Sequence, residues 1–315
     1  MKHWKFKGQG EIILEENIIY LVDAYAQIYR GYHAIKSLTT KDGKPSNAIF
    51  AIAKFLISLR KDFNPEYGAF VFDKGLPAER LAIHSEYKAN RPGMPDDMRC
   101  QIETIRELIA SFGWRIIETE GVEADDIIAA IAKKITSERI KILTNDKDIS
   151  QVVDSRVTIL AVNSFTKEIE ERTPDKVYQK YGVRPNQIVD YLAMVGDSSD
   201  NITGLPGIGS KTASKLLEEF GSIANIYLFP EKLKTEKLRT LFLENKELLE
   251  RNIKIITLDS DLELDKLSNL KDLILNKINK SSMERIAAEY ELKSLHGIIN
   301  EICTSTPVQE DLFNF

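Results

Sequence analysis

The sequence contains few of the residues that hold small secreted or metal-binding folds together. Only two of its 315 residues are cysteine (Cys100 and Cys303) and four are histidine, which excludes a disulfide scaffold and a Cys- or His-based metal motif. Its longest apolar runs span about five residues, far short of the ~20 that cross a membrane. The N-terminal residues include basic side chains but no apolar segment, which excludes a secretory signal. We therefore expect a cytoplasmic protein of about two domains.

An excess of positive charge is also missing. The chain has 43 Lys and Arg against 48 Asp and Glu, a net charge of −5. Proteins that bind nucleic acid are usually basic. If the protein binds nucleic acid, many of its acidic residues must therefore lie away from the binding surface and serve another function.

Short apolar runs alternate with helical patterns from residue 18 to about 160. This order predicts an α/β fold with a mostly parallel sheet and helices on both of its faces. The predicted strands are 18–23, 68–73, 115–120, 140–146 and 157–160, and the predicted helices are 45–61, 98–112 and 124–135.

The pattern changes after residue 173. Short helices are predicted at 174–182 and 185–196, followed by a segment rich in glycine and proline and then by helices to about residue 302. We therefore expect an N-terminal extension, an α/β domain, a helical domain and a flexible tail, with the bounds 1–17, 18–173, 174–302 and 303–315.

Acidic residues follow the predicted strands. Asp23, Asp73 and Asp146 end three of them, and the carboxyl ends of parallel strands form the ligand crevice of an open sheet. Further acids lie close by in sequence or in a neighbouring segment: Glu123, Asp125, Asp126, Asp148, Asp197 and Asp200. Any one group alone is best explained as a helix cap. Together they would repel one another unless divalent cations neutralise them.

A site of carboxylates without His or Cys favours the hard cations Mg²⁺ or Mn²⁺. Such cations above a carboxylate cluster usually serve phosphoryl chemistry, with two ions flanking the reacting phosphate. If these nine acids bind metal, Lys and Arg outnumber Asp and Glu in the rest of the chain. The surface around the site can then be basic.

The segment GLPGIGSKTASKLLEEFG (204–221) places two glycines before an amphipathic helix. Gly207 and Gly209 allow a tight turn with free backbone N–H groups, and the helix N-terminus lies beside them, which together form a phosphate site. Lys211 and Lys215 follow on the next turns. This pattern, within residues 196–221, is typical of a helix–hairpin–helix that contacts the DNA backbone without sequence preference.

A polar, proline-interrupted segment, HSEYKANRPGMPDDMR (84–99), follows the second predicted strand. It contains Tyr87, Lys88 and Arg91. An aromatic ring beside cations suits a nucleic-acid strand that is stacked and guided electrostatically. Alone, the segment is equally typical of a solvated loop.

In this order, the motifs resemble those of the bacterial 5′→3′ exonuclease and flap endonuclease family, which is related to the N-terminal nuclease domain of DNA polymerase I. The resemblance covers residues 18–295, without a polymerase domain, and implies a stand-alone nuclease. The matching blocks are LVDAYAQIYRGYHA (21–34), GKPSNAI (43–49), VFDKG (71–75), YKANRPGMPDDMR (87–99), EGVEADDIIA (120–129), LTNDKDISQ (143–151), 173–213 and KLLEEFGS (215–222).

The resemblance implies a resolvase-like (PIN-like) core, a helical arch at about 77–100 and a helix–hairpin–helix (H3TH) domain. It implies that the nine acids bind two Mg²⁺ ions, for which Mn²⁺ can substitute. One ion would have Asp23, Asp73, Glu123, Asp125 and Asp126 around it, and the other would lie towards Asp146, Asp148, Asp197 and Asp200. It also implies a K⁺ ion at the hairpin. Lys88 and Arg91 would contact the scissile phosphate, Tyr87 would stack near it, and Arg30 would contact a DNA phosphate. The expected activity is 5′→3′ exonuclease and 5′-flap endonuclease hydrolysis of DNA, acting as a monomer in RNA-primer (Okazaki fragment) processing and repair.

The C-terminal residues resemble the short peptide that bacterial replication proteins insert into the sliding clamp. Gln309, Leu312 and Phe313 would be its anchors, and the alternative is a tail that packs on its own domain. Asn145 departs from the family, where glycine is frequent, with little expected effect.

Two other functions stay open. The first is a metal-dependent ribonuclease on a similar fold, although such enzymes typically lack the hairpin and the arch. The second is a non-catalytic binder of branched DNA, although none of the acids is missing. A Rossmann cofactor enzyme is excluded, because no glycine-rich loop follows the first strand.

Overall fold

A computed structural model describes residues 4–7, 11–14, 17–162, 168–264, 267 and 269–304. The expected clamp peptide, with Gln309, Leu312 and Phe313, lies outside the described residues. In the N-terminal extension, β1 (Trp4–Lys7) pairs antiparallel with β2 (Glu11–Leu14). In the part of the chain that is described, no helix combines the length and the apolar character needed to cross a membrane.

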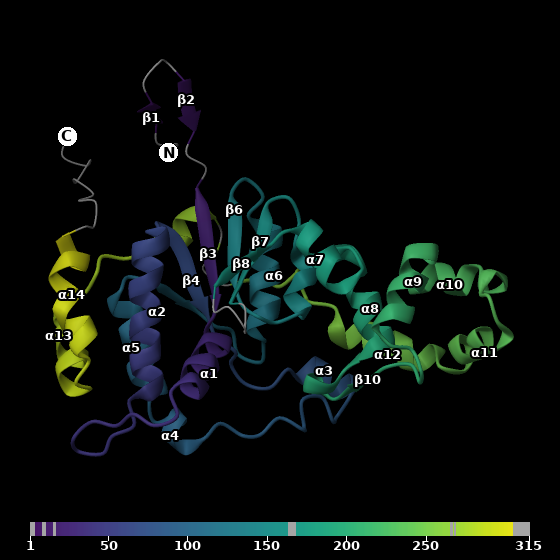
Figure 1. Cartoon of the computed structure of the whole chain (residues 1–315), viewed down its shortest axis with the longest axis horizontal. Helices are drawn as coiled ribbons and strands as arrows, with labels where there is room; N and C mark the ends of the chain where they lie inside the picture. The colour runs from purple at the N-terminus through teal and green to yellow at the C-terminus, as the bar shows by residue number, and fades with distance from the viewer. Residues whose placement is uncertain are drawn as a thin grey trace.

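A six-stranded sheet forms the centre of the N-terminal part (Figure 1). Its strands, in spatial order, are β5 (Arg115–Ile117), β4 (Tyr67–Val71), β3 (Ile18–Asp23), β6 (Arg139–Leu143), β7 (Val157–Val162) and β8 (Ile169–Arg172). The first five are parallel and β8 is antiparallel, which confirms the mostly parallel sheet. The prediction missed β8, because its sequence IEER has no apolar alternation.

Strand β3 shows why its sequence is apolar throughout. Ile19 and Leu21 belong to the core on one face of the sheet, whereas Tyr20 and Val22 belong to the core on the other. Successive side chains of a strand point to opposite faces, so a strand covered on both sides needs an unbroken apolar run.

Helices cover both faces of the sheet (Figure 1). One face packs against α1 (Ala24–Ala34), α2 (Asn47–Phe63) and α5 (Ile102–Ser111), with α13 (Lys280–Glu289) and α14 (Lys293–Thr304) outside them. The other face packs against α6 (Ala124–Lys134). The C-terminal helices therefore return to the α/β part after the chain has built its helical part.

The helical part lies to one side of the sheet, beyond β7 and β8, and shares its core (Figure 1). Its helices are α7 (Pro174–Tyr181), α8 (Ile188–Val195), α9 (Ser210–Phe220), α10 (Ile223–Leu228), α11 (Glu236–Glu244) and α12 (Lys246–Ile256), with the 3₁₀ turns η2 (Pro185–Gln187), η4 (Pro230–Lys232) and η5 (Leu270–Leu273). A continuous apolar cluster links Ile127 of α6 through Leu192 of α8 to Leu249 of α12. The helical part thus packs against the α/β part through a shared apolar core.

Several predicted boundaries were wrong. The helix predicted at 98–112 is two helices, α4 (Asp96–Arg99) and α5, because buried Gln101 between them accepts hydrogen bonds from the first N–H groups of α2. Strands β4, β5 and β6 end two to three residues early, so Asp73 and Asp146 lie in loops beyond the strand ends. Helix α14 reaches Thr304, so Cys303 belongs to a helix rather than to the expected tail.

Candidate active site

The first group of predicted carboxylates lies where the parallel strands end, as the sequence predicts. Asp23 ends β3; one oxygen accepts the N–H of Ala26 at 3.0 Å, which caps α1, and the other accepts the hydroxyl of Thr144 at 2.9 Å. Asp73 accepts the N–H of Ala124 at 2.9 Å, at the start of α6. These aspartates are therefore helix caps and members of a carboxylate cluster at once.

Asp23, Asp73, Asp125 and Asp146 lie close enough for their charges to raise one another's pKa. Burial and the nearby Asp73 raise the pKa of Asp23 to about 7. Burial, followed by the charges of Asp146, Asp23 and Asp73, raises the pKa of Asp125 well above its ordinary value. Carboxylates that repel one another in this way are stabilised by a cation, and a set of oxygens without His or Cys suits Mg²⁺ or Mn²⁺.

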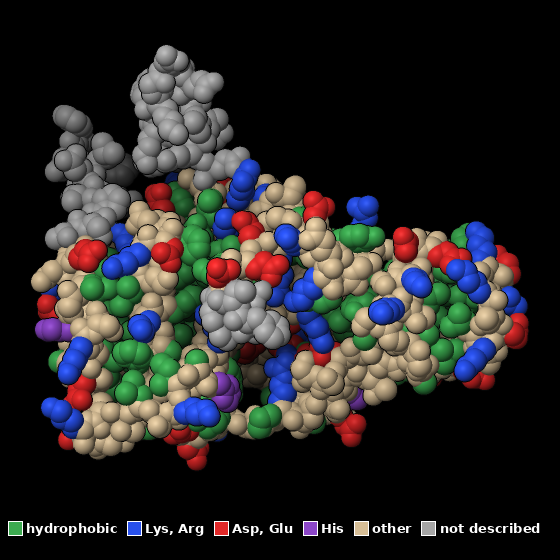
Figure 2. Space-filling view, in the orientation of Figure 1, with side chains coloured by type: hydrophobic (Ala, Val, Ile, Leu, Met, Phe, Trp, Pro, Cys, Tyr) green, Lys and Arg blue, Asp and Glu red, His purple; other side chains and the backbone are tan. Residues whose placement is uncertain are grey.

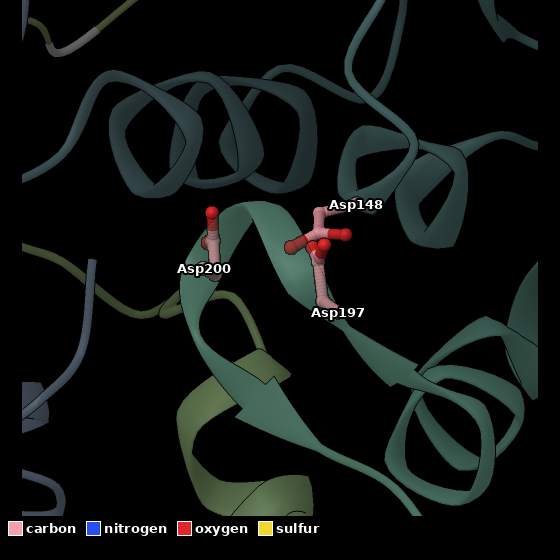
Figure 3. Close-up of side chains that lie close together, drawn as sticks. All are labelled: Asp148, Asp197 and Asp200. Carbon is pink, nitrogen blue, oxygen red and sulfur yellow. The ribbon is translucent and has the colours of Figure 1, made fainter. Parts of the chain in front are cut away.

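A second group consists of Asp148, Asp197 and Asp200 (Figure 3). Each offers an oxygen within 4.8 Å of the others. Asp148 lies on the 3₁₀ turn η1 (Asp148–Val152), Asp197 ends the short strand β9 (Gly196–Asp197), and Asp200 ends η3 (Ser198–Asp200). Strand β9 pairs with β10 (Ile202–Thr203), a pairing that the sequence pattern did not predict.

Asp148 provides a direct test of whether the second group fits a metal. Its Oδ1 is buried and has no hydrogen-bond partner among the described residues. Burial and the charge of Asp146 raise the pKa of Asp148 well above its ordinary value. A buried carboxylate oxygen without a donor is costly unless a cation binds it, so the residues present fit a divalent ion.

Glu123 and Asp126 share one face of the start of α6, as predicted, but that face meets an arginine. Arg80, on α3 (Ala78–Ile83), forms ion pairs with both carboxylates. It also donates to the carbonyl of Ile255 at 2.8 Å, and Asp126 accepts the N–H of Asp259 at 2.8 Å. Sequence reasoning missed Arg80, since nothing in its local pattern distinguishes it from a solvated loop arginine.

The arch cations contact the carboxylates directly. Lys88 forms an ion pair with Glu123 and lies 3.8 Å from Asp200. Arg91 forms an ion pair with Asp200 and donates to the carbonyl of Ser199 at 3.2 Å. Lys88 has a φ of 56°, in the left-handed region that a residue with a side chain rarely adopts. The structure therefore brings both predicted cations to the carboxylate cluster.

Tyr87 does not have the exposure expected of a stacking ring. It is 7 % exposed, and its hydroxyl donates to Glu123 at 3.2 Å or to Asp200 at the same distance. Burial and these two acids raise its pKa. A base cannot stack on a buried ring, so in this conformation Tyr87 positions the two carboxylates instead.

The arch also lies against the loop that carries Asp200. The Asn90 side chain donates to the carbonyl of Ser198 at 2.6 Å, and the Asn201 side chain donates to the carbonyl of Glu86 at 2.8 Å. These bonds join segments more than 100 residues apart in sequence. The position of the second carboxylate group is therefore tied to that of the arch.

Lys147 is a further cation that sequence reasoning missed, although it lies within the quoted motif LTNDKDISQ. Its ammonium is 2.7 Å from Asp197. Burial opposes ionisation of Asp197, but hydrogen bonds from Lys147 and Ser199 lower its pKa. Asp197 is therefore ionised, and the ammonium of Lys147 offsets part of its negative charge.

The predicted hairpin lies between α8 and α9. Gly207 has a φ of 76°, and a side chain at Gly207 or Gly209 would meet no protein atom within 4 Å. Lys211 and Lys215 are exposed on the first turns of α9. The turn, the helix N-terminus and both lysines are therefore accessible to a phosphate backbone. Figure 2 shows a hollow between the α/β and helical parts, with Lys and Arg side chains beside it.

Arg30 lies on α1, apart from the arch in sequence. Its guanidinium lies over the ring of Phe55, 5.7 Å from the centroid, and burial lowers its pKa. The structure therefore places Arg30 against an apolar surface and leaves its expected phosphate contact a prediction.

Comparisons with known proteins agree with this geometry. Residues 18–182 match the 5′-3′ exonuclease N-terminal resolvase-like domain, and residues 183–281 match the 5′-3′ exonuclease C-terminal SAM fold. The 5′-3′ exonuclease of Aquifex aeolicus is 36 % identical over 286 residues, which cover 90 % of this chain and 96 % of that protein. DNA polymerase I of Caldicellulosiruptor bescii is 38 % identical over 279 residues, which cover 87 % of this chain but only 32 % of the polymerase.

Solved structures share the fold. The T5 5′-exonuclease with bound zinc has a TM-score of 0.63 at 22 % identity, covering 91 % of this chain and 100 % of that one. The catalytic core of Rad2 with a DNA substrate has a TM-score of 0.61 at 18 % identity, covering 92 % of each chain. The resolvase-like core and the helical domain expected from the sequence are thus confirmed. The chain is a nuclease and belongs to the 5′-3′ exonuclease family.

Proposed function

We propose that this nuclease hydrolyses DNA from 5′ ends and at 5′ flaps, with two divalent cations. The observation that carries the proposal is the pair of carboxylate groups at the carboxyl edge of the sheet, with the arch cations Lys88 and Arg91 in contact with them. A phosphodiester is complementary to both features, because its oxygens can bind the metals and its negative charge attracts Lys88 and Arg91. The T5 5′-exonuclease binds zinc and the catalytic core of Rad2 binds a DNA substrate in their solved structures, which supports the same substrate class.

The carboxylates divide the metal binding between them. Asp23, Asp73, Asp125 and Asp146 would hold one ion, and Asp148, Asp197 and Asp200 would hold the other, with Mg²⁺ as the natural ion and Mn²⁺ as a substitute. When bound, such ions lower the pKa of a water and stabilise the leaving oxygen. Glu123 and Asp126 would act behind the first group, because Arg80 already engages both of them.

The arch residues would exchange partners when DNA enters. The scissile phosphate would take Lys88 from Glu123 and Arg91 from Asp200, which places two positive charges where negative charge develops in the transition state. Arg91 can bind two phosphate oxygens at once, which Lys cannot. Tyr87 would keep Glu123 and Asp200 in place during this exchange, and Arg30 would bind a neighbouring DNA phosphate.

The hairpin would hold the duplex. Free N–H groups around Gly207 and Gly209 and the N-terminus of α9 would bind backbone phosphates, with Lys211 and Lys215 adding charge. A K⁺ ion between the hairpin and the DNA belongs to the same proposal. Contacts of this kind carry no sequence information, which suits an enzyme that recognises the shape of a 5′ end.

In the cell we propose a monomeric enzyme that removes RNA primers (Okazaki fragment processing) and serves DNA repair in the cytoplasm, at the nucleoid. The DNA polymerase I relatives support this role, although the chain spans only about a third of their length. We also propose that Gln309, Leu312 and Phe313 bind the sliding clamp. The test is binding of a 304–315 peptide to the cognate clamp; equal binding by a peptide with Leu312→Ala and Phe313→Ala would end that idea.

The central experiment is cleavage of a labelled 5′-flap duplex beside a blunt duplex, a single strand and an RNA strand of the same sequence. We expect cutting near the flap junction with Mg²⁺ and none with EDTA. Cutting of RNA alone would favour the ribonuclease alternative. Binding of the flap without cutting, with Mg²⁺ or Mn²⁺ present, would favour the non-catalytic binder.

A further inference from the structure

Lys147 places a positive charge inside the second carboxylate group. It lies in the sequence between two of the predicted ligands, Asp146 and Asp148, and its ammonium is 2.7 Å from Oδ1 of Asp197. The Asp197 side chain is only 3 % exposed, whereas that of Lys147 is 32 % exposed. The partly exposed Lys147 side chain thus pairs with the buried carboxylate of Asp197.

Asp197 accepts several hydrogen bonds at one oxygen. Its Oδ1 accepts Lys147 and, from Ser199, the backbone N–H at 2.9 Å and the hydroxyl at 2.6 Å. Asp148, in contrast, has a buried oxygen without a donor among the described residues. Lys147 therefore neutralises Asp197, as Arg91 neutralises Asp200, and Asp148 is left to a further cation.

We propose that Lys147 competes with the divalent cation for Asp197 and so lowers the metal affinity of the second site. This inference rests on the proposed assignment of Asp148, Asp197 and Asp200 to that site. An ammonium in contact with Asp197 lies within a few ångströms of any metal bound by the same group, and like charges at that separation repel strongly. The site is consequently weaker than its three carboxylates alone would make it.

The surroundings give Lys147 room to withdraw. A cavity of about 520 Å³ lies beside it, lined by Asn90 of the arch and by Ser198, Asn201 and Thr203. The flexible four-carbon stem of a lysine allows the ammonium to move into that space. A divalent cation can thus occupy the second site only after Lys147 leaves Asp197. The arch lines the same cavity through Asn90, so it lies next to the space that the lysine would enter.

The test measures metal binding without substrate. Free Mn²⁺ is titrated into the full chain and followed by electron paramagnetic resonance, for the wild type, Lys147→Met and Lys147→Arg. We expect Lys147→Met to tighten one class of Mn²⁺ sites, the class that Asp197→Asn weakens, by about tenfold or more, because the repulsion is removed. Lys147→Arg keeps the charge and should stay close to the wild type.

The matched control is Lys141→Met. Lys141 has a similarly covered side chain and an ion pair with Glu171 at 3.4 Å, outside the carboxylate groups. Its substitution should leave both classes of Mn²⁺ sites unchanged. Unchanged or weaker Mn²⁺ binding by a folded Lys147→Met variant overturns the inference. It would mean that the lysine has no effect on metal affinity or that it helps to organise the site.

Asp197→Asn separates failure of the inference from failure of the site assignment. If Asp197→Asn weakens one class of Mn²⁺ sites and Lys147→Met leaves that class unchanged, only the role of Lys147 is wrong. If Asp197→Asn leaves both classes unchanged, the second site itself is wrong and the inference fails with it. Lys147→Gln serves as a second neutral variant if thermal unfolding shows that Lys147→Met does not fold.

Discussion

Replacing Arg80 by methionine should destabilise the fold strongly. The guanidinium is 11 % exposed and pairs with Glu123 and Asp126, whose side chains are 9 % and 6 % exposed. Removing one partner of a buried ion pair typically costs 3–5 kcal/mol, because the remaining charge is left without compensation. Methionine keeps the apolar stem, so the loss reports on the charge.

The contacts around Arg80 show where this loss arises. Glu123 keeps Lys88 and the hydroxyl of Tyr87, but Asp126 keeps only the N–H of Asp259 among the described donors. The loss should therefore be about 3–5 kcal/mol at pH 7 and arise mainly at Asp126.

The assay is urea unfolding at pH 7, followed by tryptophan fluorescence, since Trp114 is buried beside β4. Arg106→Met is the control, because the pair of Arg106 with Glu118 is about one-quarter exposed and should contribute about 1 kcal/mol or less. Arg80→Met combined with Asp126→Asn should recover part of the stability. A loss below about 1 kcal/mol, or a double variant that recovers nothing, would refute the reasoning.

Three further predictions follow from the same geometry. Asp73→Asn should abolish cleavage of a 5′-flap duplex, and its Kd for that duplex should stay equal or fall, because a negative charge facing the phosphates is lost; near-normal cleavage would contradict the metal assignment. Lys211→Ala should weaken duplex binding and reduce the slope of log K against log salt by about 0.9, and an unchanged slope would exclude the hairpin contact. Because the fold raises the pKa of Asp23 to about 7, the folded state binds a proton there that the unfolded state releases near pH 4, so stability in EDTA should fall as the pH rises from about 4 to 7. Thermal melts should show that Mg²⁺ restores this loss and that Asp23→Asn flattens it; parallel curves for wild type and variant would count against the shift.

The sequence alone was sufficient for the elements whose signal is local. An unbroken apolar run such as residues 18–22, alternating with helical patterns, is typical of a parallel sheet covered on both faces, so β3 and its neighbours were predictable. The carboxyl ends of such strands lie at one edge, so the convergence of Asp23, Asp73 and Asp146 followed from topology. The turn at Gly207 and the lysines of α9 were likewise predictable, because glycine spacing and helix periodicity act over a few residues.

Only the tertiary structure decided which charges meet. Arg80 contacts Ile255, 175 positions away, and no local pattern can specify a partner at that distance. The same holds for Tyr87, whose ring is buried because the arch packs against Asp200, 113 positions along the chain. Strand β8 forms by backbone hydrogen bonding to the edge of β7. Its charged sequence therefore did not predict a strand. Local sequence determines elements and their faces, whereas pairing among long charged side chains depends on the position of every element at once.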